Sequence, residues 1–200
     1  MTRSRFIRLL KDKSYSYEIE GDRIIVTSGR RTTYDDNAYF DIRSIPSGVV
    51  FKNGGKVDLK KLTSLPHGVE FDNKGDVNLD SLISLHHGME FNNRGSVDLR
   101  SLTSLPPGVE FNNRGGVDLR SLTSLPPGVV FRNKDNGIFR GNVDLRSLTS
   151  LPPGVEFKNG EDVYLVYLVD GWFKYWKGNI EGIDSKRLLN LMISKGVFER

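Results

Sequence analysis

One unit of this 200-residue chain reads Ser104-Leu-Pro-Pro-Gly-Val-Glu-Phe-Asn-Asn-Arg-Gly-Gly-Val-Asp-Leu-Arg-Ser-Leu-Thr123. Serines equivalent to Ser104 recur every 20 residues from Ser44 to Ser124, and the next one, Ser150, is delayed by 6 extra residues. Self-similarity at a short fixed period is typical of repeat architectures. The chain is therefore predicted to consist of stacked copies of one small structural unit.

Each unit contains two short runs in which apolar and polar residues alternate. In the quoted copy these runs are Val109-Glu-Phe111 and Val117-Asp-Leu119. Such alternation indicates β-strands with one buried face. The runs are separated by Pro106-Pro-Gly108 and Arg114-Gly-Gly116, and Pro and Gly favour tight corners. Each unit is thus predicted to form one turn of a coil, with two strands and two corners.

A single turn is too small to fold alone. Burying its apolar side chains yields about 1.5–3 kcal/mol each, and together they fall short of the backbone entropy of ordering every residue of the turn, roughly 1–2 kcal/mol per residue. Stacking turns pairs their strands and joins their apolar side chains into one core. We therefore expect a mainly β fold, a single-stack β-solenoid of 20-residue turns.

Two columns of equivalent residues are predicted to lie inside this stack. The aromatic column comprises Phe51, Phe71, Phe91, Phe111, Phe131 and Phe157. The amide column comprises Asn53, Asn73, Asn93, Asn113, Asn133 and Asn159. We expect the Asn amides to satisfy backbone groups at a corner and to stack on one another, because Asn readily bonds to nearby backbone.

The run Leu-Thr-Ser-Leu-Pro-Pro-Gly-Val, followed by a short Val-Asp-Leu strand, resembles the short leucine-rich-repeat-like β-solenoid proteins of bacteria and bacteriophages. The resemblance covers about Ile42 to Leu165. The chain departs from the standard leucine-rich pattern because the Leu-x-Leu-x-x-Asn segment is not intact. The resemblance implies protein recognition and no shared catalytic residue.

Both ends of the chain differ from the repeat, as a stack with exposed terminal turns requires. We expect an N-terminal cap (1–36), solenoid repeats (37–166) with an insertion loop at 134–142, and a C-terminal cap (167–200). The N-terminal cap is predicted to contain a short amphipathic helix around Phe6 to Leu10 and a hairpin that turns at Gly21-Asp22. The C-terminal cap is predicted to combine an aromatic segment with a helix at about 185–195.

The composition argues against catalysis. The chain has no Cys, which excludes thiolate chemistry and disulfides, and its net charge is only +4. Carboxylates and cations recur in regular columns, whereas an active site needs one unusual cluster. His67, His86 and His87 lack neighbouring ligands at metal-binding spacing. We therefore expect no enzyme activity, no cofactor and no metal, although a hydrolase or transferase site near these His residues is kept as a weak alternative.

The interaction hypothesis assigns partner binding to residues that break the repeat. The candidates are Lys134, Ile138, Phe139 and Arg140 in the insertion loop, and Trp172, Phe173, Tyr175 and Trp176 near the C-terminus. Secondary candidates are Arg100, Arg120 and Arg146, a column set beside a column of Asp that is expected to neutralise it. Exposed aromatic residues and insertions often dominate protein interfaces.

The predicted function is a non-catalytic protein–protein interaction scaffold whose partner is a macromolecular complex. The resemblance suggests a phage-encoded inhibitor of a bacterial defence complex, such as an anti-CRISPR protein, that acts by direct binding. The alternative is a nucleic-acid-binding protein that uses the basic N-terminus and the Arg column. A homodimer through the C-terminal cap is a further hypothesis. With neither a secretion signal nor a membrane span in the sequence, we expect a soluble, cytoplasmic protein.

Overall fold

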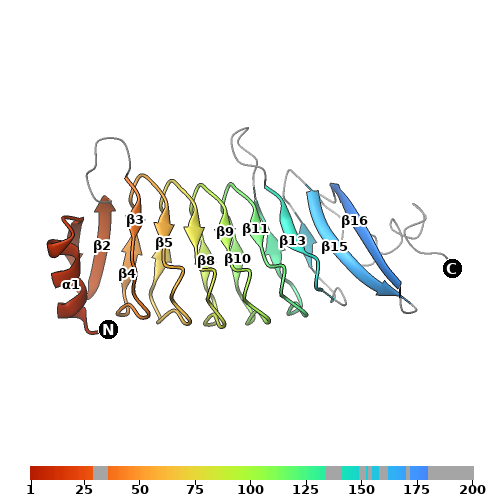
Figure 1. Cartoon of the computed structure of the whole chain (residues 1–200), viewed down its shortest axis with the longest axis horizontal. Helices are drawn as coiled ribbons and strands as arrows, with labels where there is room; N and C mark the ends of the chain where they lie inside the picture. The colour runs from red at the N-terminus through yellow and green to blue at the C-terminus, as the bar shows by residue number, and fades with distance from the viewer. Residues whose placement is uncertain are drawn as a thin grey trace.

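The computed structural model is an elongated stack with helix α1 (Arg3–Asp12) at one end and strands β15 (Asp162–Val169) and β16 (Trp172–Asn179) at the other (Figure 1). The structure describes residues 1–28, 36–133, 141–148, 152, 155–157, 162–169 and 172–179. For residues 162, 164–169 and 172–179 it describes the backbone only.

Fourteen further strands precede β15 in the described part of the chain. They are β1 (Ser16–Glu20), β2 (Arg23–Ser28), β3 (Ala38–Tyr39), β4 (Val49–Phe51), β5 (Val57–Asp58), β6 (Glu70–Phe71), β7 (Val77–Asn78), β8 (Glu90–Phe91), β9 (Val97–Asp98), β10 (Glu110–Phe111), β11 (Val117–Asp118), β12 (Val130–Phe131), β13 (Val143–Leu145) and β14 (Glu156–Phe157).

The strands form two eight-stranded sheets. The first has the order β1-β2-β4-β6-β8-β10-β12-β14, and the second has the order β16-β15-β13-β11-β9-β7-β5-β3. Strands of successive turns pair in parallel and in register, so that Phe111 lies beside Phe91 and Asp118 beside Asp98. The fold is mainly β, with parallel strands that recur about 20 residues apart, an arrangement compatible with a β-solenoid.

The predicted aromatic column is confirmed. From Phe51 to Phe157 its members are at most 1% exposed, and neighbouring rings stack with centroids 5.2–5.8 Å apart and planes within 8° of parallel. The column continues towards the N-terminus, because Phe40 contacts both Phe51 and Phe6 of α1, at centroid distances of 5.9 and 5.6 Å. One apolar core therefore runs from α1 along the stack.

Glycine is required at two corners of the turn, for different reasons. Gly108 has φ +74°, the left-handed conformation that a Pro–Gly type II turn needs at its Gly. Gly115 is required by close approach, because a Cβ there would lie 2.5 Å from the backbone nitrogen of Ser96 in the preceding turn. The second corner thus sets how closely successive turns stack.

The amide column ties these second corners together. Its described members, from Asn53 to Asn133, are fully buried. The Nδ2 group of Asn93 donates to the carbonyls of Gly95 and Ser96 in its own corner, at 2.9 and 3.3 Å, and to Gly75 of the preceding turn at 3.2 Å. The predicted satisfaction of backbone groups is confirmed.

The expected stacking of one Asn amide on the next is limited. The Nδ2 group of Asn133 donates to Oδ1 of Asn113 at 2.8 Å. The Oδ1 atoms of Asn53, Asn73 and Asn93 have no hydrogen-bond partner within the described residues. The amide column therefore acts mainly as a set of donors, since most of its contacts are made by Nδ2.

The chain before the repeat folds as the sequence predicts locally. Helix α1 buries Phe6 and Leu10 and begins after Thr2, whose side chain accepts a hydrogen bond from the backbone of Arg5 at 3.3 Å. Strands β1 and β2 form the antiparallel hairpin. The latter also pairs in parallel with β4, which joins the hairpin to the first sheet.

After the repeat the structure adds a strand that the sequence analysis does not anticipate. Strand β15 continues the second sheet, pairing in parallel with β13. The backbone of the aromatic segment then forms β16, which runs antiparallel to β15. Asn159, the predicted helix at 185–195 and the insertion residues 134–140 lie outside the described residues.

Replacing Asn93 by Ala is expected to lower the free energy of unfolding by about 2–3 kcal/mol, because a buried donor is lost and a void remains. The matched control is Asn92→Ala, at an exposed neighbour, which should change stability by less than about 0.5 kcal/mol. Urea denaturation measures both values. Equal losses would contradict the role assigned to the buried amide.

Candidate functional site

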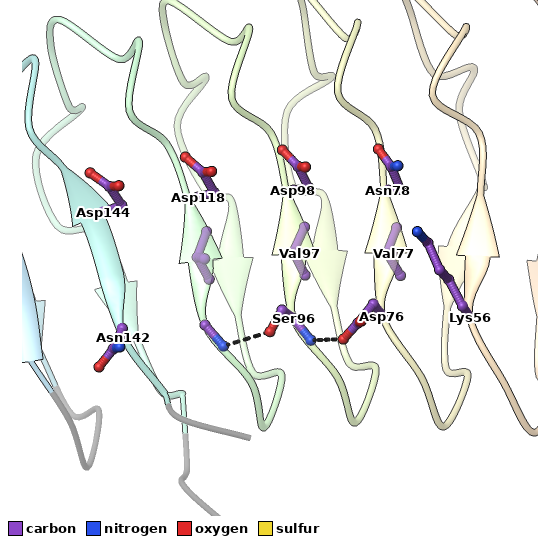
Figure 2. Close-up of a pocket in the computed structure, with 12 residues that line it drawn as sticks. Lys56, Asp76, Val77, Asn78, Ser96, Val97, Asp98, Asp118, Asn142 and Asp144 are labelled. Atoms are coloured by element: carbon purple, nitrogen blue, oxygen red, sulfur yellow. Dashed lines mark hydrogen bonds between the residues drawn. The ribbon is translucent and has the colours of Figure 1, made fainter. Parts of the chain in front are cut away.

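The outer face of the second sheet carries a shallow groove of about 400 Å³ that crosses strands β7, β9, β11 and β13 and reaches Lys56, just before β5 (Figure 2). Two rows of side chains form this face. The acceptor row comprises Asp58, Asn78, Asp98, Asp118 and Asp144, of which all but Asp58 line the groove. The variable row comprises Lys56, Asp76, Ser96, Gly116 and Asn142, all of which line it.

The acceptor row has a structural function that repeats in every turn. Oδ1 of Asp98 accepts a hydrogen bond from the backbone N–H of Arg100, two residues later, at 3.2 Å. The other members accept the equivalent bond at 3.1–3.3 Å. The position therefore requires a short side chain with an oxygen acceptor, which explains why Asn78 replaces Asp in one turn.

The secondary candidates Arg100, Arg120 and Arg146 are all engaged by this row. Their Nη2 atoms lie 2.5–2.6 Å from Oδ2 of the Asp two residues earlier in each turn. The hydrogen bonds that Arg100 donates to Asp98, together with the charge of that carboxylate, raise the pKa of Arg100, and the hydrogen bonds that Arg120 donates to Asp118 raise the pKa of Arg120. The predicted neutralisation between neighbouring columns is confirmed.

One turn differs from the others in its charges. In this turn Asn78 takes the place of the Asp. Two residues later, at the repeat position where other turns carry Lys or Arg, the chain has Asp80. Asp80 pairs with Arg100 of the following turn, at 3.3 Å from its Nε. Arg100 thus pairs with two carboxylates, Asp98 of its own turn and Asp80 of the preceding one, which leaves one negative charge in excess.

The variable row creates the groove because its side chains become smaller along the stack, from Lys56 to Gly116. Its members are also tied together: Ser96 N–H donates to Oδ1 of Asp76 at 2.7 Å, and Gly116 N–H donates to Oγ of Ser96 at 3.1 Å (Figure 2). The groove is therefore polar, shallow and internally hydrogen-bonded. These properties suit the binding of a polypeptide segment.

The candidate residues from the sequence are not brought into this groove by the described structure. Lys134, Ile138, Phe139 and Arg140 lie outside the described residues, and for Trp172, Phe173, Tyr175 and Trp176 only the backbone of β16 is described. The groove residues were not among the candidates. The signal that could have identified them is the decreasing side-chain size at one repeat position.

The three His residues make a different contact from the one that repeat spacing suggests. The sequence places His67 and His87 at equivalent positions, but the rings that contact each other belong to His67 and His86, with centroids 4.7 Å apart. Nδ1 of His86 lies 3.0 Å from the carbonyl oxygen of His87. Across the described part of the chain, no group of three or more His, Asp or Glu residues is placed to hold a metal ion.

Comparison with known proteins adds no relative: no family model, no curated protein and no solved structure matches this chain. In the described residues, no helix combines the length and the apolar character that crossing a bilayer would need. The groove is therefore interpreted from its own geometry.

Replacing Asp98 by Asn is expected to change the free energy of unfolding by less than about 0.5 kcal/mol, because the acceptor is kept and an exposed ion pair contributes little. Asp98→Ala should cost about 1 kcal/mol, because the N–H of Arg100 loses its partner. Urea denaturation distinguishes the two. Equal destabilisation by both substitutions would show that the charge, and not the acceptor, matters.

Proposed function

We propose that this chain is a non-catalytic protein-binding scaffold whose groove receives a polypeptide segment of a partner. The observation that supports this is the internal fixation of the groove side chains, such as Asp98 by Arg100 and Asp76 by Ser96. Side chains that are already ordered lose little conformational entropy when a partner binds. A surface of this kind favours one complementary shape.

The dimensions of the groove are those of a short peptide. The five positions of the variable row, in successive turns about 4.8 Å apart, span roughly 19 Å. That length corresponds to about six residues of extended chain or about three and a half turns of helix. Polar acceptors and small side chains along its length suit hydrogen bonding to a docked segment.

For the fold itself, we infer a leucine-rich-repeat-like β-solenoid closed at both ends by caps. The N-terminal cap is supported by α1, which buries Phe6 and Leu10 against the core, and by the β1–β2 hairpin, which extends the first sheet. At the other end, the antiparallel pair β15–β16 extends the second sheet. Covering terminal turns protects exposed strand edges from other chains.

Binding of nucleic acid by the Arg column and the basic N-terminus has less support. The guanidinium groups of the column are engaged by Asp side chains of their own turns. Arg3 of the N-terminus donates to the carbonyls of Gly21 and Arg23, at 3.0 and 3.5 Å. The narrower hypothesis of a phage-encoded inhibitor stays a prediction that depends on the family resemblance alone.

Filling the groove tests the scaffold. We expect Gly116→Tyr to reduce partner recovery about tenfold, a loss of about 1.4 kcal/mol in binding. The stack should remain intact, because the equivalent positions carry side chains as large as Lys56. Partners are captured on the immobilised chain from a lysate of the source organism and quantified by mass spectrometry.

The matched control is Asn92→Tyr, an exposed position directly after β8 of the first sheet, and it should leave recovery unchanged. Melting curves of both variants check that each is folded. If Gly116→Tyr captures the same proteins in the same amounts as the unmodified chain, the groove is not the binding site.

A further inference from the structure

A second row of charges lies along the corner that precedes the groove. Lys74, Arg94 and Arg114 occupy equivalent positions of three successive turns, and all three are exposed. We name these three residues the basic ridge. Each lies two positions before a member of the variable row, so the ridge borders the groove along one side.

The head groups of the basic ridge are available, in contrast to those of Arg100 and its equivalents. Within the described residues, Lys74, Arg94 and Arg114 make no side-chain hydrogen bond and no ion pair. Their backbones are held firmly, because each N–H donates to the carbonyl of a buried Asn in the preceding turn, at 2.9–3.2 Å. The ridge therefore presents free cations from fixed positions.

The surroundings compensate the charge of the ridge unevenly. The positions two residues before and after Lys74 carry Asp72 and Asp76. Around Arg94 and Arg114, the same positions carry neutral residues, namely Asn92, Ser96, Asn112 and Gly116. The ridge is thus most positive at its second and third members, beside the part of the groove with the smallest side chains.

We propose that the basic ridge recognises an acidic helix of the partner protein, an inference that builds on the proposed scaffold function. Successive turns of the stack are about 4.8 Å apart, and acidic side chains one turn apart on a helix are about 5–6 Å apart. Long Lys and Arg side chains absorb the small mismatch over three members. Same-side residues of an extended strand lie about 6.6 Å apart, which fits less well.

An acidic protein fits the ridge better than nucleic acid. Three cations correspond to about three phosphate contacts, which supply only a weak, salt-sensitive affinity. Binding of single strands usually adds aromatic side chains on which bases stack. The described positions next to Arg94 and Arg114 carry Asn, Ser and Gly in place of aromatic residues.

The test uses two synthetic helical peptides of equal length and composition. In one, Glu residues are spaced three and four apart so that they share a face, and in the other they are spread around the helix. We expect the first peptide to bind about tenfold more tightly in fluorescence anisotropy at low ionic strength. Equal binding of the two peptides would overturn the proposal.

Charge reversal locates the binding. The triple variant Lys74→Glu, Arg94→Glu, Arg114→Glu should lose at least about tenfold in affinity for the first peptide, and the milder Lys74→Gln, Arg94→Gln, Arg114→Gln variant should also bind more weakly. The matched control, Arg5→Glu, Arg8→Glu, Lys11→Glu, makes the same change in net charge on exposed residues of α1 and should keep the affinity. Equal losses in the ridge and control variants would indicate unspecific attraction and would contradict the proposal.

A single-stranded oligonucleotide is titrated alongside the peptides. Tighter binding of this oligonucleotide than of the first peptide, lost in the ridge variant, would replace the acidic helix by nucleic acid. Failure of the ridge is distinguishable from failure of the scaffold. If the first peptide does not bind but lysate capture still depends on Gly116, the ridge proposal is wrong and the scaffold stands.

Discussion

The structure depends on the close contact between successive second corners of the coil. At Gly95 and Gly115 one turn lies directly against the next, and a Cβ would collide with the neighbouring backbone. The buried amide of Asn93 then bonds to carbonyls on both sides of that contact. Because the turns are locked at these corners, their strands pair in exact register and equivalent side chains line up in columns.

The same register that stacks the Phe rings inside the core orders the charges outside it. On the outer face of the second sheet, Asp and Arg columns stand side by side, so ion pairs form within single turns and the face is close to neutral. At the neighbouring corner, the cations of the basic ridge have no such column beside Arg94 and Arg114. One repeating backbone thus presents a neutral groove and a positive edge next to each other.

The interior of the stack could be predicted from the sequence, because inward and outward residues alternate and recur at a fixed period. That logic identified the columns of Phe111 and Asn113, whereas helix α1 was identified from its amphipathic pattern and the β1–β2 hairpin from its Gly-Asp turn. The groove could not be predicted in this way, because repeat spacing does not show which exposed columns lie next to each other on the outer face of a sheet. The acceptor role of Asp98 was also missed, since it depends on the position of a backbone N–H.

Repeat spacing also left open which cations are free to bind a partner. Sequence spacing places Arg114 and Arg120 in columns of equal regularity, and it drew attention to the second. The sequence predicted that the Asp column neutralises the column of Arg120, but the free guanidinium of Arg114 emerged only from the structure. The aromatic segment after β15 was likewise expected only as part of a cap. Its backbone forms strand β16, which pairs antiparallel with β15 at the edge of the second sheet.

The displaced ion pair of Asp80 restricts how an array like this one grows by gene duplication. A turn that balances its own charge, with Asp118 beside Arg120, is copied without electrostatic conflict, and residues 101–109 and 121–129 are identical in sequence. Asp98 stacks beside Asp118 because each has an Arg of its own turn. A tandem copy of the turn that carries Asn78 would instead place a second Asp80 about 4.8 Å from the first, with no cation of its own to offset the repulsion. Duplication of that turn would therefore add an unpaired carboxylate, whereas duplication of the turn with Asp118 and Arg120 would not.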